Sequence, residues 1–182
     1  MELNYALTEN DYLQQQLYLA SKNEQIKKQR KLNRILVLVI LLIIGFLFYI
    51  NNILFVAYYF TSASIICFLL FPFYLKKFYR IVFKKYVKAN FKNKIGINTT
   101  VLFIEDSLEV ISKGIGDHRI NFSNFKNISE IDNYFFIAFN TGESFMIPKD
   151  GIEDVEGLRT KLKGIAGNLK IEFISELDWK WK

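Results

Sequence analysis

A long stretch without charge, residues 35–75, constrains this chain more than any other feature. It contains no Asp, Glu, Lys, Arg or His, and about 18 such apolar residues already suggest a membrane span. A single helix of this length would measure about 60 Å, twice the roughly 30 Å of a bilayer core. We therefore expect two helices, at 32–50 and 53–75. Asn51 and Asn52 would form the turn between them, because asparagine tolerates the left-handed backbone that ends helices.

The charges on either side of this stretch predict its orientation. "KKQRKLNR" precedes the pair and "KKFYRIVFKKYVK" follows it, whereas the expected turn is uncharged. Positive residues are retained in the cytoplasm, so both termini should be cytoplasmic. In the second span Ala57, Thr61 and Ser64 share one helical face, which would let the two helices approach closely. Average membrane composition explains these residues equally well, and the helices could also mediate a homo-oligomer.

The segment 76–96 is basic and contains no acidic residue. Its lysines and arginines alternate with Phe, Tyr and Val, as in a helix that lies on anionic lipid headgroups. A solvated extension of the second membrane helix is the alternative. The possible membrane-surface contacts are Lys76, Lys77, Arg80, Lys84, Lys85 and Lys88.

The first 31 residues predict a cytoplasmic amphipathic helical arm. Thr8 is a suitable N-cap, with Asp11 three residues later, and neither Gly nor Pro interrupts the segment. A narrow apolar face, expected to pack on the carboxy-terminal domain or on a membrane helix, consists of Leu13, Leu17 and Ala20.

Residues 97–182 have the pattern of a small cytoplasmic sheet domain. Short runs rich in Val, Ile and Phe alternate with turn residues, and they predict strands at 99–105, 108–112, 118–122, 127–131, 134–139 and 144–148. A helix at 152–163, ended by Gly164, should follow, and "LKIEFIS" could add a strand. The fold class is therefore α+β: an N-terminal helix, a transmembrane hairpin, and an antiparallel sheet of pleckstrin-homology-like type closed by a C-terminal helix.

Several stretches resemble one family of bacterial membrane proteins. They are "YALTENDYLQQQLYLASK", the two-span hairpin, "FIEDSLEVISKG", "INFSNFKNISEIDNYFFIAF" and "ESFMIPKDGI". Together they look like the YcxB-like family, although that family commonly has Trp where Phe122 or Phe125 stands here. The resemblance implies a two-helix anchor in the bacterial inner membrane and a YcxB-like sheet domain, and it assigns no activity to particular residues.

The residues that usually carry chemistry are sparse, so we expect no enzyme. His118 is the only histidine, and no nucleophile motif accompanies it. One histidine and the single cysteine, Cys67, cannot form a usual zinc site. We expect no catalytic residue, metal or cofactor. Nucleic-acid binding is not expected either, because residues 101–182 carry ten basic and fourteen acidic residues.

Partner binding is the remaining function class. The exposed-looking stretch "IPKDGI" and the tail "DWKWK" offer possible partner contacts at Lys149, Asp150, Trp179 and Trp181. A strand exit before a helix and a frayed terminus are the ordinary interpretations of the same residues. The sequence predicts a membrane-anchored, non-enzymatic binding or regulatory protein that contacts lipid headgroups or an unidentified protein. The alternative is a membrane-bound immunity protein that neutralises a toxin.

Overall fold

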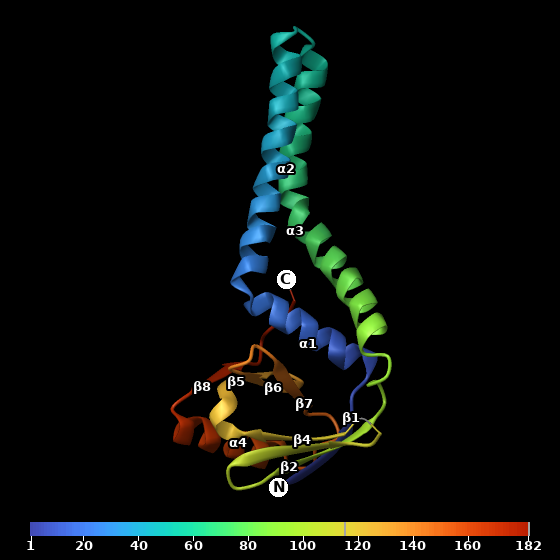
Figure 1. Cartoon of the computed structure of the whole chain (residues 1–182). Coiled ribbons are helices and arrows are strands. Elements are labelled where there is room, and N and C mark those ends of the chain that lie inside the picture. Colours follow the sequence, from blue (N-terminus) through green and yellow to red (C-terminus); the bar gives the residue numbers. More distant parts are fainter. Residues whose placement is uncertain (115, 182) are drawn as a thin grey trace. The chain divides into compact units, whose positions relative to one another are not determined.

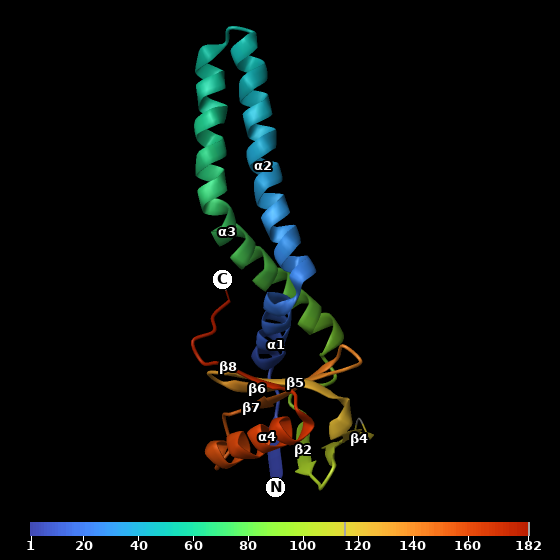
Figure 2. The same cartoon turned by 90° about the vertical axis from the view of Figure 1, so that its left-hand side faces the viewer.

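The structure is a computed structural model that describes residues 1–114 and 116–181 (Figures 1 and 2). The chain divides into two compact units. One contains residues 1–12 and 87–180 and is called the sheet domain below. The other contains residues 13–86 together with Trp181 and is called the hairpin unit. The divisions fall inside helices α1 (Glu9–Lys22) and α3 (Leu54–Asn90).

Two long helices, α2 (Glu24–Ile50) and α3, lie side by side in the hairpin unit (Figures 1 and 2). Each is long and apolar enough to cross a membrane. The expected turn between them is confirmed: Asn52 has φ of 57°, and the Asn51 side chain donates to the Leu47 carbonyl at 2.7 Å. The helices extend beyond the charge-free stretch, α2 at its start and α3 at its end.

Helix α3 is continuous but bends in the stretch that contains Pro72 (Figures 1 and 2). Proline lacks the N–H that would continue the helical ladder, and its ring displaces the preceding turn. Beyond the bend the helix runs on to Asn90, so the basic residues expected at the membrane surface are helical.

The sheet domain contains two four-stranded sheets (Figures 1 and 2). Sheet A is antiparallel, and its strands in spatial order are β1 (Glu2–Ala6), β2 (Asn98–Phe103), β3 (Ser107–Ser112) and β4 (Gly116–Asn121). Sheet B has the spatial order β7 (Ser144–Pro148), β6 (Tyr134–Phe139), β5 (Phe125–Ile131) and β8 (Glu172–Glu176). A short 3₁₀ turn, η1 (Phe122–Asn124), precedes β5, and helix α4 (Val155–Leu169) connects β7 to β8.

The six expected strands of this domain are present, and their bounds are close to those predicted. One expectation about the end of the chain is wrong. Helix α4 passes through Gly164 and ends at Leu169, with Lys170 as its C-cap in the left-handed conformation, φ 55°. The strand expected at "LKIEFIS" is confirmed as β8, which pairs in parallel with β5, and a sheet closed by the helix stays a prediction. The fold is mixed α/β, and a pleckstrin-homology-like topology stays a prediction.

Strand β1 lies in the segment for which only a helix was expected. Leu3 pairs with Val101 and Tyr5 with Thr99 in antiparallel register. Helix α1 begins after this strand, and its predicted cap is confirmed: the Thr8 amide donates to Asp11 Oδ2 at 2.7 Å. The chain that precedes α2 and α3 is therefore part of the same sheet as the chain that follows them.

The core of the sheet domain takes large apolar side chains from both sheets and from α4. Each of its most deeply buried members is almost inaccessible: Val101, Leu108, Ile128, Phe135, Ile137, Ile147, Leu158 and Leu162. Phe122 and Phe125 also lie in this core, with ring centroids 5.2 Å apart.

Candidate functional site

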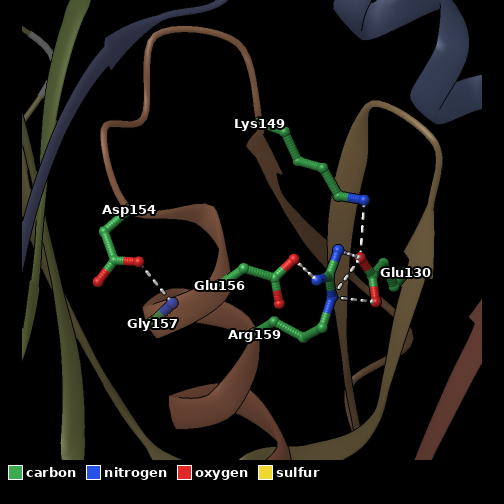
Figure 3. A network of polar contacts seen from close by, with 6 residues as sticks. All are labelled: Glu130, Lys149, Asp154, Glu156, Gly157 and Arg159. Atoms are coloured by element: carbon green, nitrogen blue, oxygen red, sulfur yellow. Dashed lines mark hydrogen bonds and ion pairs between the residues drawn. The ribbon is translucent and has the colours of Figure 1, made fainter.

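A buried carboxylate, Glu130 of β5, is the centre of the main polar network in the sheet domain (Figure 3). Arg159 of α4 donates from Nε to both carboxylate oxygens, at 2.8 and 3.0 Å, and from Nη2 at 2.6 Å. Lys149, which follows β7, donates from Nζ at 2.7 Å. Glu156 also pairs with Arg159, on the exposed side. The network ties β5, β7 and α4 together.

The charges in this network fix its protonation state. Burial alone would raise the pKa of the Glu130 carboxyl, but the hydrogen bonds and charges of Arg159 and Lys149 outweigh it and lower that pKa below 4.5. The hydrogen bond from Arg159 to Glu130 raises the pKa of the guanidinium in turn. Glu130 is therefore a carboxylate saturated with cationic donors, an arrangement that holds a fold together.

Lys149 and Asp150, two predicted partner contacts, lie at one edge of this network. The Lys149 side chain is only 13% exposed and is directed at Glu130 (Figure 3). Asp150 is exposed in the turn that follows, so of the two it is the more accessible to a partner. Sequence analysis missed Glu130 and Arg159. The available signal was an acidic residue within an apolar strand, "NISEI".

A second polar contact joins α1 to sheet B. The Tyr134 hydroxyl of β6 donates to Asp11 Oδ1 at 2.6 Å, while the other carboxylate oxygen of Asp11 caps the helix through Thr8. Burial, followed by the bond to Asp11, raises the pKa of Tyr134 well above its usual range. This contact, too, is structural, because both of its groups are already engaged with the chain.

In the hairpin unit, small residues let α2 and α3 approach closely. A Cβ added at Gly45 would lie 3.1 Å from Thr61 Oγ1 and 3.3 Å from the Ala57 carbonyl oxygen. Ala57 and Ser64 are buried. The predicted close face of the second span is therefore confirmed, and Gly45 is the partner on α2 that the sequence analysis did not identify.

The outward faces of the same helices are apolar and exposed. Their side chains that are more than 60% exposed include Phe46, Phe55, Tyr58, Tyr59, Phe73 and Tyr74. Few of the residues in either apolar stretch are buried inside the protein. Soluble proteins rarely expose contiguous apolar surface on this scale, so these faces need an apolar environment.

The bend at Pro72 has a specific partner on α2. Because Pro72 has no N–H, the carbonyl of Phe68, four residues earlier, lacks its helical donor. Arg34 Nε donates to that carbonyl at 3.0 Å, and the guanidinium carbon lies 3.8 Å from the centre of the Phe68 ring. Arg34 thus satisfies the polar group that the bend releases.

Trp181, another predicted partner contact, is packed against α3 within the hairpin unit. Its indole Nε1 donates to the Lys76 carbonyl at 3.1 Å, and it is only 7% exposed. The Arg30 guanidinium lies 4.9 Å from the Trp181 ring and 5.7 Å from the Tyr79 ring. Trp179 is partly buried, and its amide donates to the Glu176 carbonyl. Trp181 is therefore engaged within the chain.

The six predicted membrane-surface residues are all exposed on α3: Lys76, Lys77, Arg80, Lys84, Lys85 and Lys88. Apolar side chains of the same helix segment are 41 to 48% exposed, namely Phe78, Ile81, Val82 and Tyr86. Lys88 also lies 3.9 Å from Glu9. An exposed helix segment with both cationic and apolar side chains is compatible with a lipid surface, and that contact stays a prediction.

Residues that often bind metals are dispersed. Among residues 1–114 and 116–181, no group of three or more His, Cys, Asp and Glu side chains could hold a metal ion. His118 is exposed in β4 opposite Val110, and Cys67 is exposed on α3.

Comparison with known proteins bears on one part of the chain. Residues 103–162 match the family model described as YcxB-like protein. This segment is similar to the YcxB-like family. It extends from the end of β2 into α4 and therefore includes Glu130, Lys149 and Arg159, and the two apolar helices precede it. The resemblance expected from the sequence is confirmed for this segment. No curated protein and no solved structure matches the chain.

Proposed function

We propose that this protein is a membrane-anchored, non-enzymatic binding or regulatory protein of bacteria, which presents its YcxB-like sheet domain at the cytoplasmic face of the inner membrane. The observation that carries the proposal is the pairing of β1 with β2, which lie before and after the two apolar helices. The following paragraphs give the support for the anchor, its topology and its role.

The anchor is supported by the exposure of α2 and α3. Fully burying a large apolar side chain stabilises it by about 1.5–3 kcal/mol relative to water, and both helices have many such side chains on their outer faces. The seam around Gly45 and Ala57 is covered within the unit, whereas most of the outer apolar side chains are exposed. A bilayer supplies the missing apolar environment. A helix satisfies most of its backbone polar groups internally, as a bilayer requires, and Arg34 supplies the donor that Pro72 removes from the Phe68 carbonyl.

The topology is supported by β1. Its residues Glu2 to Ala6 pair one by one with Leu102 to Asn98 of β2, and the Gly96 amide donates to the Leu7 carbonyl at 2.9 Å. A strand and its partner must lie on the same side of a membrane. The chain between them therefore crosses the membrane an even number of times, which a two-helix hairpin does.

The cytoplasmic side is supported by the charges of the hairpin unit. Residues 13–86 contain eleven Lys and Arg but only one acidic residue, Glu24, and all twelve lie outside the charge-free stretch. The turn at Asn51 and Asn52 carries no charge. Because positive flanks stay in the cytoplasm, only this turn would be outside.

A binding role rather than catalysis is supported by the hydrogen bonds of the buried polar groups, which already engage partners within the chain. Glu130 already accepts from Arg159 and Lys149, and the Tyr134 hydroxyl already donates to Asp11. A general acid or base must reach the proton of a substrate. The exposed Asp150, beside the Glu130 network, is the more suitable point for a partner.

Cysteine labelling tests the anchor. In a Cys67→Ser background, single cysteines replace the exposed residues Asn10, Asn51 and Lys180. In intact bacterial cells a membrane-impermeant maleimide should modify only Asn51→Cys, and the other two should react after permeabilisation. Labelling of Lys180→Cys in intact cells would overturn the proposed topology.

A photo-crosslinking amino acid tests the binding role. Placed at Asp150 in native membranes, it should give a discrete adduct by mass spectrometry. The same group at His118, exposed on β4 and not a predicted contact, is the control. Identical adduct patterns from both positions, or none from Asp150, would argue against a partner at this edge of the domain.

A further inference from the structure

A cavity of about 250 Å³ lies between α2 and α3 within the hairpin unit. One wall, from α2, is cationic and consists of Lys27, Arg30, Lys31 and Arg34. The other wall, from α3, is apolar and consists of Phe71, Pro72 and Leu75. We call these seven residues the basic groove. None of them belongs to the predicted surface contacts of α3.

The four cations of the basic groove occupy one face of α2. Their spacing is i, i+3, i+4 and i+7, which places them side by side on a helix. Like charges at this spacing repel and destabilise the helix. Glu24 lies 2.7 Å from Lys27 and is the only acidic residue between Asp11 and Glu105. Among the residues that the structure describes, none forms an ion pair with Lys31. The groove therefore has excess positive charge that an anion would neutralise.

Two of these cations are held in place. Arg34 is fixed by the Phe68 carbonyl that Pro72 releases, and Arg30 lies against the rings of Tyr79 and Trp181. Each contact engages one part of a guanidinium that has five N–H donors in a planar fork. A cation that is held before the ligand arrives loses less entropy on binding, so the site is preorganised for a phosphate group.

The place of the groove along the chain identifies the source of that phosphate. Arg34 is the last charged residue before the charge-free stretch, and Leu75 is the last residue of that stretch. Along α2, the cationic wall therefore ends where the charge-free apolar stretch begins. A soluble anion would use only the cations. A lipid would also place its acyl chains along Phe71 and Leu75, as lipids do in basic pockets between membrane helices.

We infer that the basic groove binds the phosphate headgroup of one anionic membrane lipid. This inference rests on the proposed anchor, because the groove meets a lipid only if α2 and α3 span the bilayer. Lys27 and Lys31 supply further positive charge, Arg30 and Arg34 supply guanidinium donors that are already held, and the headgroup would occupy the cavity of about 250 Å³ beside Pro72.

Native mass spectrometry of the full chain in detergent tests the inference. The probes are phosphatidylglycerol, phosphatidylcholine and inorganic phosphate. The wild type should retain one phosphatidylglycerol at least tenfold more tightly than phosphatidylcholine. Lys27→Gln with Lys31→Gln should weaken phosphatidylglycerol binding at least tenfold. The charge-matched control, Lys84→Gln with Lys85→Gln on α3, should change it less than threefold, and Lys27→Arg with Lys31→Arg should retain it.

Three outcomes would overturn the inference that the basic groove binds an anionic lipid. They are equal affinity for the two lipids, equal losses in the groove variant and its α3 control, and lipid-free binding of inorganic phosphate with the affinity of phosphatidylglycerol. Unchanged circular dichroism of the variants excludes misfolding. The cysteine-labelling experiment separates the two proposals: a chain that spans as a hairpin but does not select phosphatidylglycerol refutes only the groove.

Discussion

In the sheet domain, large apolar side chains such as Phe135 and Ile137 are buried. Along the apolar helices of the hairpin unit the pattern is different: Phe55 is 85% exposed. The buried residues there include the small residues Gly45, Ala57 and Ser64. The hydrophobic effect drives helices or strands together only when water is the alternative environment. Where helices face lipid, van der Waals contact between small residues takes over the role of the hydrophobic effect in holding the helices together. The exposed apolar faces of α2 and α3 are therefore what the proposed membrane anchor predicts, whereas the sheet domain has the buried apolar core of a domain that folds in water.

Polar groups follow one rule in both units. In the sheet domain, Arg159 and Lys149 compensate the buried Glu130. In the hairpin unit, Arg34 compensates the Phe68 carbonyl that Pro72 leaves without a helical donor. A buried polar group without a partner costs about 1–3 kcal/mol, and an apolar environment has no water to supply one. Packing therefore differs between the two units, but hydrogen-bond satisfaction does not.

The largest expected effect comes from the same substitution made in each unit. Ile137→Ala in β6 leaves a cavity in the core and should lower the free energy of unfolding by about 4 kcal/mol. Ile66→Ala in α3, where the side chain is 56% exposed, should change it by less than about 0.5 kcal/mol. Urea titration of the full chain in detergent measures both. Equal losses would mean that Ile66 faces protein rather than lipid.

The second effect concerns the Glu130 network. Glu130→Ala leaves Arg159 and Lys149 without their buried counter-ion and should cost about 3 kcal/mol, near the lower end for broken buried pairs. Glu156→Ala removes a carboxylate that is 78% exposed from the same arginine and should cost less than about 1 kcal/mol. Thermal unfolding compares the two variants, and a smaller loss for Glu130→Ala than for Glu156→Ala would contradict a structural role for the network.

The pH dependence of stability provides an independent check of the role of the Glu130 carboxylate. The lowered pKa of Glu130 means that its carboxylate stabilises the folded state at pH values above 4.5, and that this stabilisation is lost as pH falls through the lower pKa of the folded protein. The difference in stability between wild type and Glu130→Ala should therefore narrow below pH 4.5. A difference that stays constant in acid would show that the charge of Glu130 is not what stabilises the domain.

Features with local signals were the ones the sequence predicted well. The absence of charge over residues 35–75 and the pair Asn51–Asn52 are contiguous in the chain, so they indicated the two helices and their turn. Short runs rich in Val, Ile and Phe, separated by turn residues, similarly indicated the strands from β2 to β7. Periodicity and turn residues report on neighbours in sequence, which is why these elements could be read directly.

Features that depend on distant partners were missed. Strand β1 has five residues and becomes recognisable only through its pairing with β2, more than 90 residues later. Glu130 was not identified because its partners, Lys149 and Arg159, come from other elements. Gly164 appeared to end α4, but the apolar face of that helix continues to the buried Ile165 and Ala166. Tertiary packing outweighed the local signal in each case.

A third prediction compares glycines in the two units. Gly45→Leu places a side chain against Thr61 and the Ala57 backbone and should destabilise the hairpin unit by about 2 kcal/mol through overpacking. Gly164→Leu, where an added Cβ meets no atom within 4 Å, should be neutral or stabilise α4 by up to about 1 kcal/mol. Unfolding by sodium dodecyl sulfate, followed by circular dichroism, measures both. If Gly45→Leu is neutral, α2 and α3 do not pack through this seam.

The smallest expected effect tests how β1 joins the rest of the sheet domain. The Tyr5 hydroxyl is buried and donates to the Met146 carbonyl of β7 at 3.1 Å, and burial raises the pKa of Tyr5 above its usual range. Tyr5→Phe leaves that carbonyl without this donor and should cost about 1 kcal/mol, whereas Tyr59→Phe on the exposed face of α3 should change stability by less than about 0.5 kcal/mol. Hydrogen exchange at the amides of β1 and β7 provides the measurement. Faster exchange in both strands of Tyr5→Phe would show that the segment before the hairpin is energetically part of the domain that follows it. Unchanged exchange would remove this link. It would also weaken the argument that both flanks of the hairpin lie on the same side of the membrane.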